Sequence, residues 1–261
     1  TPNIRTVELG TSGGLFVTKG ATKLEKIPAT SVEGGSVAVG EGTCYKDCTS
    51  LRTVEGIVYP NAQTSLQYLY WNCTGLVNGG VIPEQITDIY RTFYGCTNLR
   101  RVRIESKNLT NYNQAFYGVA SLEMQIYPET DFFKSMRYNP SNLWDFESLS
   151  ETPIHRVLCF GDSLSEGTYE DDMVSLCPDN AMVASLGNGG YTSEQIYQKM
   201  VNGTYDKRLK NDIIVIWHGT NGYGTDGYDG VTAKMVAALD GNQRYLLIPP
   251  TYQGVGDEVY E

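Results

Sequence analysis

Residues 156–167 read Arg-Val-Leu-Cys-Phe-Gly-Asp-Ser-Leu-Ser-Glu-Gly, a short apolar run that passes directly into Gly161-Asp162-Ser163. Such a run before a turn predicts a buried β-strand. Two more apolar runs follow at 212–217 and 245–248, and helix-like segments lie between the runs at 193–201 and 232–239. This alternation predicts a three-layer α/β domain with a parallel sheet over residues 154–261.

Three polar motifs follow or lie beside these elements. They are Gly161-Asp162-Ser163-Leu164, the Gly-Asn-Gly-Gly-Tyr-Thr-Ser stretch at 187–193, and Gly219-Thr220-Asn221. Functional sites of parallel sheets form at the carboxyl ends of strands, where Ser163 and Asn221 are expected. In order and spacing, the three motifs resemble the conserved blocks of the GDSL-type (SGNH) serine esterases.

The resemblance implies a flavodoxin-like sheet and an acyl-ester hydrolase without metal or cofactor. Ser163 would be the nucleophile, and the oxyanion hole would consist of the backbone N–H groups of Ser163 and Gly190 and the side-chain amide of Asn221. Such donors are needed because attack on an ester carbonyl places negative charge on its oxygen.

The sequence departs from the family where a late Asp-x-x-His block should supply the general base. The chain has two histidines, His155 and His218. His155 precedes the first strand and is expected at its amino end, away from the site. His218, directly before Gly219, and Asp162 are secondary candidates. Asp257 and Tyr260 have the spacing of the missing block but not its chemistry.

A second departure is Gly222, which stands where the family has Asp. Two explanations of the missing base stay open. The favoured one is that the domain is incomplete and that its base lies beyond Glu261, since a doubly wound domain ending after a few strands leaves an apolar edge uncovered. The other is a pseudo-enzyme.

The first half of the chain repeats itself. The copies are Tyr-Lys-Asp-Cys-Thr-Ser-Leu (45–51), Tyr-Trp-Asn-Cys-Thr-Gly-Leu (70–76), Phe-Tyr-Gly-Cys-Thr-Asn-Leu (93–99) and Phe-Tyr-Gly-Val-Ala-Ser-Leu (116–122). A period of this size predicts a solenoid of stacked units. The copies resemble the leucine-rich repeats of bacterial surface antigens. In the second copy the Gly-rich stretch 77–80 predicts a bulge.

These patterns divide the chain into a β-rich cap (1–40), a leucine-rich-repeat, β-solenoid-like domain (41–138), a linker (139–153) and the front part of a hydrolase domain (154–261). Cys48, Cys73 and Cys96 occupy one repeat position, and Val119 replaces them in the last copy. They therefore predict a buried ladder of small side chains rather than a metal site, with a Cys44–Cys48 disulfide as an open alternative.

A formal net charge of −10 argues against nucleic-acid binding, and no apolar run is long enough to span a membrane. We therefore expect serine-dependent hydrolysis of a small acyl ester, best matched by an acetylated glycan, with the repeats binding a surface glycan or protein. The alternative is a non-catalytic adhesion or structural protein of a cell surface or phage tail. Because the repeats resemble those of bacterial surface antigens, the protein is expected to be secreted, at a cell surface or in a virion.

Overall fold

The computed structural model describes residues 19–27, 45–137, 144–162, 174–175, 177–202, 213–219, 221, 227–239, 241 and 244–248. The chain divides into two compact units. The first comprises Thr1–Ser135 and Asn142–Pro153, and the second comprises Met136–Ser141 and Ile154–Glu261.

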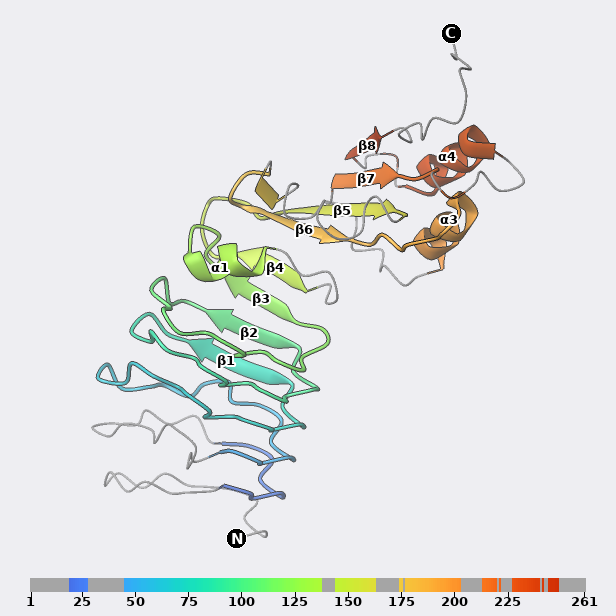
Figure 1. The fold of residues 1–261 in the computed structure, drawn as a ribbon. Coiled ribbons are helices and arrows are strands. Elements are labelled where there is room, and N and C mark those ends of the chain that lie inside the picture. The colour runs from blue at the N-terminus through green and yellow to red at the C-terminus, as the bar shows by residue number, and fades with distance from the viewer. Residues whose placement is uncertain are drawn as a thin grey trace. The chain divides into compact units, whose positions relative to one another are not determined.

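The first unit is a stack of coils whose strands form a parallel sheet in sequence order. Among the described residues the strands are β1 (Asn78–Ile82), β2 (Arg101–Ile104), β3 (Glu123–Ile126) and β4 (Asp145–Ser148) (Figure 1). Partner residues such as Arg101 and Glu123 lie one repeat apart in the chain. Residues one sequence period apart therefore lie side by side on neighbouring coils.

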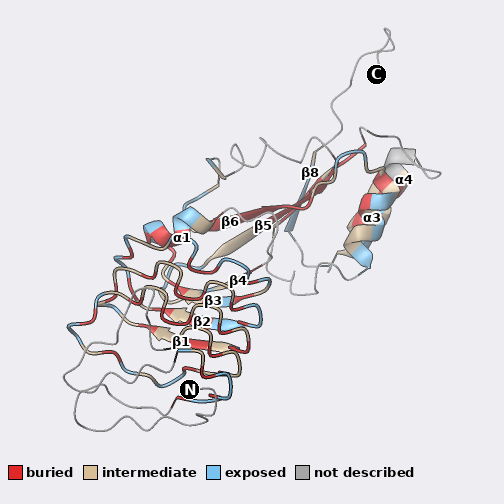
Figure 2. Ribbon diagram, turned by 60° about the horizontal axis from the view of Figure 1, so that its bottom comes forward, coloured by how far each residue is buried: buried red, intermediate tan, exposed pale blue. Residues whose placement is uncertain are grey.

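Columns of equivalent side chains fill the inside of this stack. The repeat aromatics Tyr45, Tyr70, Phe93 and Phe116 lie with ring centroids 5.4–5.7 Å apart and nearly parallel planes. Beside them, the last leucine of each repeat copy is buried. Figure 2 shows buried and exposed positions alternating along the coils. Each coil thus covers the apolar face of the next, which a single repeat could not do alone.

The cysteine ladder is confirmed for the described copies. Cys73 Sγ donates to the carbonyl oxygen of Tyr45 at 2.9 Å, and Cys96 Sγ donates to that of Tyr70 at 3.1 Å. Burial raises the pKa of Cys96 to about 12 and that of Cys73 well above its usual value. Cys44 lies outside the described residues, so the structure does not describe a pairing with Cys48.

Strand β1 carries the bulge that the glycines at 79 and 80 predict, because its pairing register with β2 shifts between Asn78 and Val81. The linker predicted over 139–153 is wrong at 145–148, where β4 pairs with β3. Four residues are too few to show a period by themselves, and the neighbouring coil supplies their partners. A short helix, α1 (Asp131–Met136), precedes β4. Of the predicted cap, only 19–27 is described.

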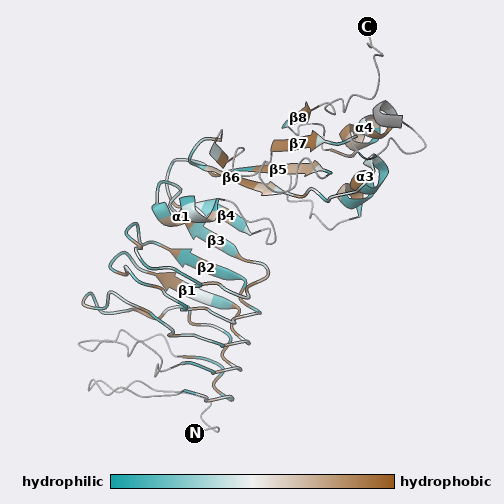
Figure 3. Ribbon diagram, viewed as in Figure 1, coloured by the Kyte–Doolittle hydropathy of each residue, from teal (hydrophilic) through white to brown (hydrophobic). Residues whose placement is uncertain are grey.

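The second unit contains a parallel sheet of order β6-β5-β7-β8 among its described strands. They are β5 (His155–Gly161), β6 (Ala181–Ser185), β7 (Ile213–Trp217) and β8 (Arg244–Ile248). Figure 3 shows the hydrophobic residues of these strands in brown. Parallel strands separated by helices confirm the α/β prediction at this level.

Two helices connect the strands in the described part of this unit, and α3 packs against β5. Helix α3 (Ser193–Val201) connects β6 to β7, and α4 (Gly227–Ala238) connects β7 to β8. The helices pack against each other, and Lys234 of α4 lies 3.5 Å from Glu194 of α3. No helix among the described residues is long and apolar enough to cross a membrane.

Candidate functional site

The strand order changes direction between β5 and β7, because β5, the first described strand of the second unit, lies between β6 and β7 in the sheet. In open parallel sheets, ligands bind at such a point, outside the carboxyl ends of the two strands. Asp162 follows β5 directly and is fully buried, and Asn221 follows β7 by four residues and is half-buried. Ser163 lies outside the described residues.

The loop after β6 is bound to the ends of both neighbouring segments. The Asn188 N–H donates to the carbonyl oxygen of Gly161, at the end of β5, at 3.1 Å. Asn221 Nδ2, beyond β7, donates to the carbonyl oxygen of Tyr191 at 3.3 Å. The structure thus brings together the three segments that carry the sequence motifs.

Gly190 occupies a tight turn in this loop. The Tyr191 N–H donates to the carbonyl oxygen of Asn188 at 3.2 Å, which closes a four-residue turn with Gly190 in its third position. Its φ of 77° is left-handed, and glycine adopts this conformation without steric cost. Gly190 is exposed, and a Cβ built there would meet no heavy atom within 4 Å. Its N–H therefore lies on an exposed and uncrowded stretch of backbone.

Helix α3 holds both ends of the loop. At its start, Thr192 and Gln195 form a reciprocal capping box, the pattern that the Thr-x-x-Gln spacing of the sequence would predict. In its last turn, Lys199 Nζ donates to the carbonyl oxygen of Leu186 at 3.2 Å and also bonds Asn188 Oδ1. The turn at Gly190 is thus fixed from the sheet side and from the helix side.

His218 is fully buried and points between the helices. Its Nδ1 lies 2.7 Å from Ser193 Oγ of α3, and its Nε2 lies 3.0 Å from Thr232 Oγ1 of α4. Burial lowers the pKa of His218, and the nearby Asp162 carboxylate partly opposes that shift. Both ring nitrogens thus bond hydroxyl groups on the helices, and His218 joins β7 to α3 and α4.

The remaining histidine is far from this edge along its strand. His155 is the first residue of β5, and its backbone N–H donates to the carbonyl oxygen of Asn180. It therefore lies at the amino end, as the sequence predicts. Within the described part of the chain, no group of three or more His, Cys, Asp or Glu side chains is placed to hold a metal ion.

Sequence reasoning missed two parts of this site. The role of Lys199 could not be predicted from the sequence, because lysines are common on the exposed face of a helix. Ser193 ends the Gly-Asn-Gly-Gly-Tyr-Thr-Ser motif, and nothing in the sequence pairs it with His218. No protein-family model, curated protein or solved structure matches this chain.

Proposed function

We propose that the second unit is an SGNH-type serine esterase in which Ser163 attacks a small acyl ester. The observation that carries the proposal is the pair of hydrogen bonds, Asn188 to Gly161 and Asn221 to Tyr191, that joins the loops after β5, β6 and β7. Three motifs that could each be an ordinary turn are thereby linked at one edge of the sheet.

In this proposal the Ser163 hydroxyl adds to the ester carbonyl and gives an acyl-enzyme with release of the alcohol. Water then hydrolyses the acyl-enzyme and frees Ser163. The N–H groups of Ser163 and Gly190 and the amide of Asn221 would stabilise the oxyanion in both steps. An amide nitrogen carries two hydrogens, so Asn221 can donate one to Tyr191 and one to substrate.

A hollow of about 430 Å³ beside the loop supports a small substrate. It is bounded by Tyr191 and by one face of α3, and the side chains on that face end in polar groups: Glu194, Gln195, Gln198, Lys199 and Asn202. These donors and acceptors can bond the hydroxyl groups of an alcohol, so an acetylated carbohydrate is the preferred substrate class. The resemblance of the repeats to bacterial surface-antigen repeats supports a location outside the cell or on a virion.

Neither histidine is assigned as the base. His155 lies at the amino end of its strand, and both ring nitrogens of His218 bond hydroxyl groups. The proposal therefore expects weak turnover by this chain alone and stronger turnover when a base is supplied. Added imidazole can act as such a base, because it has the same titrating group as histidine.

The test is labelling by a fluorophosphonate probe, together with hydrolysis of p-nitrophenyl acetate with and without imidazole. We expect labelling, and hydrolysis above the rate of imidazole and buffer without protein, to require Ser163, so that Ser163→Ala abolishes both, while Ser135→Ala, an exposed serine of the first unit, leaves them unchanged. Labelling, or hydrolysis above that protein-free rate, that persists in Ser163→Ala would refute Ser163 as the nucleophile.

A second function, a non-catalytic adhesion or structural protein, is favoured by the bonding of His218 to Ser193 and Thr232. This alternative predicts that the folded chain shows no Ser163-dependent labelling even in imidazole. The two functions therefore differ in a single experiment.

A further inference from the structure

The loop between β6 and α3 carries Gly190 at an exposed position. A Cβ built on Gly190 would meet no heavy atom within 4 Å, so no neighbouring side chain fixes this residue by packing on that side. The position of its N–H group therefore depends on the hydrogen bonds of the residues around it. These bonds involve Asn188, two residues before the glycine, and Lys199 in the last turn of α3.

Asn188 is bonded through its N–H group, its carbonyl group and its side chain. The N–H donates to the carbonyl oxygen of Gly161 at 3.1 Å, and the carbonyl oxygen accepts from the Tyr191 N–H at 3.2 Å. The side-chain oxygen Oδ1 accepts from Lys199 Nζ. The first bond ties the loop to the end of β5, and the second closes the turn that contains Gly190. The bond from Lys199 orients the residue at which that turn begins.

Lys199 contacts three parts of the same loop. Its Nζ donates to the carbonyl oxygen of Leu186 at 3.2 Å as well as to Asn188, and it lies 5.7 Å from the centroid of the Tyr191 ring. An ammonium group has three N–H donors and can bond both acceptors at once. The side chains of a helix lean toward its N-terminus, which directs Lys199 from the last turn of α3 back to the loop.

Two of the three proposed oxyanion donors depend on this turn. Gly190 lies within it, and Asn221 Nδ2 donates to the carbonyl oxygen of Tyr191, its last residue, at 3.3 Å. A shift of the turn would move the Gly190 N–H and weaken the bond that orients the Asn221 amide. Oxyanion donors stabilise a transition state only when they are held where its charge develops. The contacts of Lys199 therefore bear on the reaction and not only on the fold.

We propose that Lys199 is a positioning residue of the esterase, which holds the turn of Gly190 so that the oxyanion donors stay in place. The inference rests on the proposed function of Ser163. Lys199 acts through Asn188 and takes no part in proton transfer.

A competing role for Lys199 is direct contact with the alcohol part of a substrate, because Lys199 also lines the hollow of about 430 Å³ beside the loop. The two roles affect different reactions. A positioning residue governs every attack by Ser163, including attack on a fluorophosphonate, whose leaving group is fluoride and not an alcohol. A residue that contacts only the leaving alcohol should not change the rate of that reaction.

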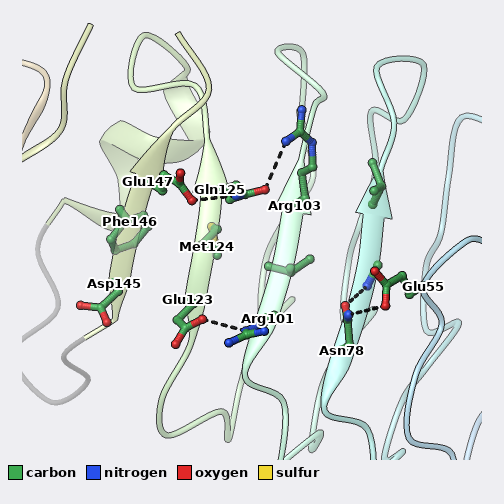
Figure 4. A pocket seen from close by; sticks show the side chains of 13 residues that line it. Glu55, Asn78, Arg101, Arg103, Glu123, Met124, Gln125, Asp145, Phe146 and Glu147 are labelled. Atoms are coloured by element: carbon green, nitrogen blue, oxygen red, sulfur yellow. Dashed lines mark hydrogen bonds and ion pairs between the residues drawn. The ribbon is translucent and has the colours of Figure 1, made fainter. Parts of the chain in front are cut away.

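Polar side chains on the outward face of the β1–β4 sheet provide a contrast (Figure 4). Arg103 donates to Gln125 at 3.2 Å, and Gln125 donates to Glu147 at 2.7 Å, so aligned positions of neighbouring strands form one row. These bonds join neighbouring coils of the first unit. Arg103 is therefore a suitable control, because its loss removes a hydrogen-bonded cation that does not contact the loop of Gly190.

The test compares rates of fluorophosphonate labelling of the full chain in imidazole, with Ser163→Ala as the blank. Lys199→Met keeps an apolar stem and removes the charge and the donors, whereas Lys199→Arg keeps a cation with N–H donors. The matched controls are Lys234→Met, on α4, where the lysine lies 3.5 Å from Glu194, and Arg103→Met in the first unit.

The expected effect follows from the loss of precise placement. Removing one oxyanion donor slows a reaction about 100- to 1,000-fold, and Lys199→Met displaces a donor without removing it. We therefore expect Lys199→Met to slow labelling about 10- to 100-fold, Lys199→Arg to restore most of the rate, and both controls to match the unsubstituted chain.

Hydrogen exchange of the same variants adds a measurement that does not require activity. The hydrogen-bonded amides of Leu186, Asn188 and Tyr191 should exchange faster in Lys199→Met, while those of β5 and β7 stay unchanged. Faster exchange of β5 and β7 as well would overturn the proposal, because Lys199 would then stabilise the whole unit and not the turn.

The labelling rates separate this proposal from the esterase proposal. An unchanged rate in Lys199→Met would overturn the positioning role and leave the esterase proposal standing. A slower rate without faster exchange of the loop would also overturn it, since Lys199 would then act on the bound group. If the unsubstituted chain shows no labelling that depends on Ser163, the esterase proposal fails and the positioning role fails with it.

Discussion

Arg137→Ala should destabilise the second unit far more than other arginine substitutions. The Arg137 side chain is buried and donates to backbone carbonyl oxygens of the segment 174–181 at 2.8–3.0 Å. The acceptors are Val174, Cys177, Pro178 and Ala181, and the Asp179 carboxylate lies 3.1 Å away. The backbone carbonyl oxygen of Arg137 accepts from the Val183 N–H of β6, and this bond fixes Arg137 beside the sheet.

The size of the effect follows from those bonds. A hydrogen bond to a charged donor contributes about 1.5–3 kcal/mol, and a carbonyl left buried without a donor costs a further amount. Pro178 and Asp179 are exposed, and water can replace their bonds. Of the three other acceptors, Val174 and Cys177 are half-buried and only Ala181 is fully buried, so the loss should be about 3 kcal/mol. This is a large share of the roughly 5–15 kcal/mol that stabilises a typical domain.

Hydrogen exchange followed by mass spectrometry measures this loss for each unit. A loss of about 3 kcal/mol should speed exchange of the β5, β6 and β7 amides about 100-fold and leave β2 and β3 unchanged. The control is Arg101→Ala, whose exposed ion pair with Glu123 should contribute at most about 1 kcal/mol. Less than about a threefold change in β5–β7, or an equal change in β2 and β3, would refute the reasoning.

Three further predictions address the site and the repeats. Asn221→Ala should slow Ser163 labelling about 100- to 1,000-fold while circular dichroism stays unchanged, and an unaltered labelling rate would remove Asn221 from the oxyanion hole. Because burial lowers the pKa of His218 below 6.5, the unfolded chain takes up its proton more readily, so the free energy of unfolding should fall as pH drops below about 6.5. Urea titrations should show this fall weakened in His218→Gln but kept in His155→Gln, and equal slopes would contradict it. Cys73 and Cys96 are buried with raised pKa values and should resist iodoacetamide at pH 8 until urea is added, and modification of either residue in the native chain would show that the stack opens.

Periodic and strongly apolar segments could be predicted from the sequence. The repeats indicated which residues form the aromatic and cysteine columns, because equivalent positions of an in-register period stack on one another in neighbouring coils. The strands at β5 and β7 were evident because runs such as Ile213-Ile214-Val215-Ile216 are buried on both faces of a parallel sheet. Strand β6, with the sequence Ala-Met-Val-Ala-Ser, was not predicted, because it is short and lacks β-branched residues apart from Val183.

The sequence by itself therefore determined the period of the first unit, the α/β class of the second and the three motifs that point to an oxyanion site. The tertiary structure decided which side chains meet: that His218 bonds Ser193 and Thr232, that Lys199 holds the loop of Gly190, and that Arg103, Gln125 and Glu147 form one row. Local patterns of hydrophobicity and turn residues act between neighbours in the chain, so they can be read from the sequence. The partner of a polar side chain is set by strand order and register, and these emerge only when distant segments pack.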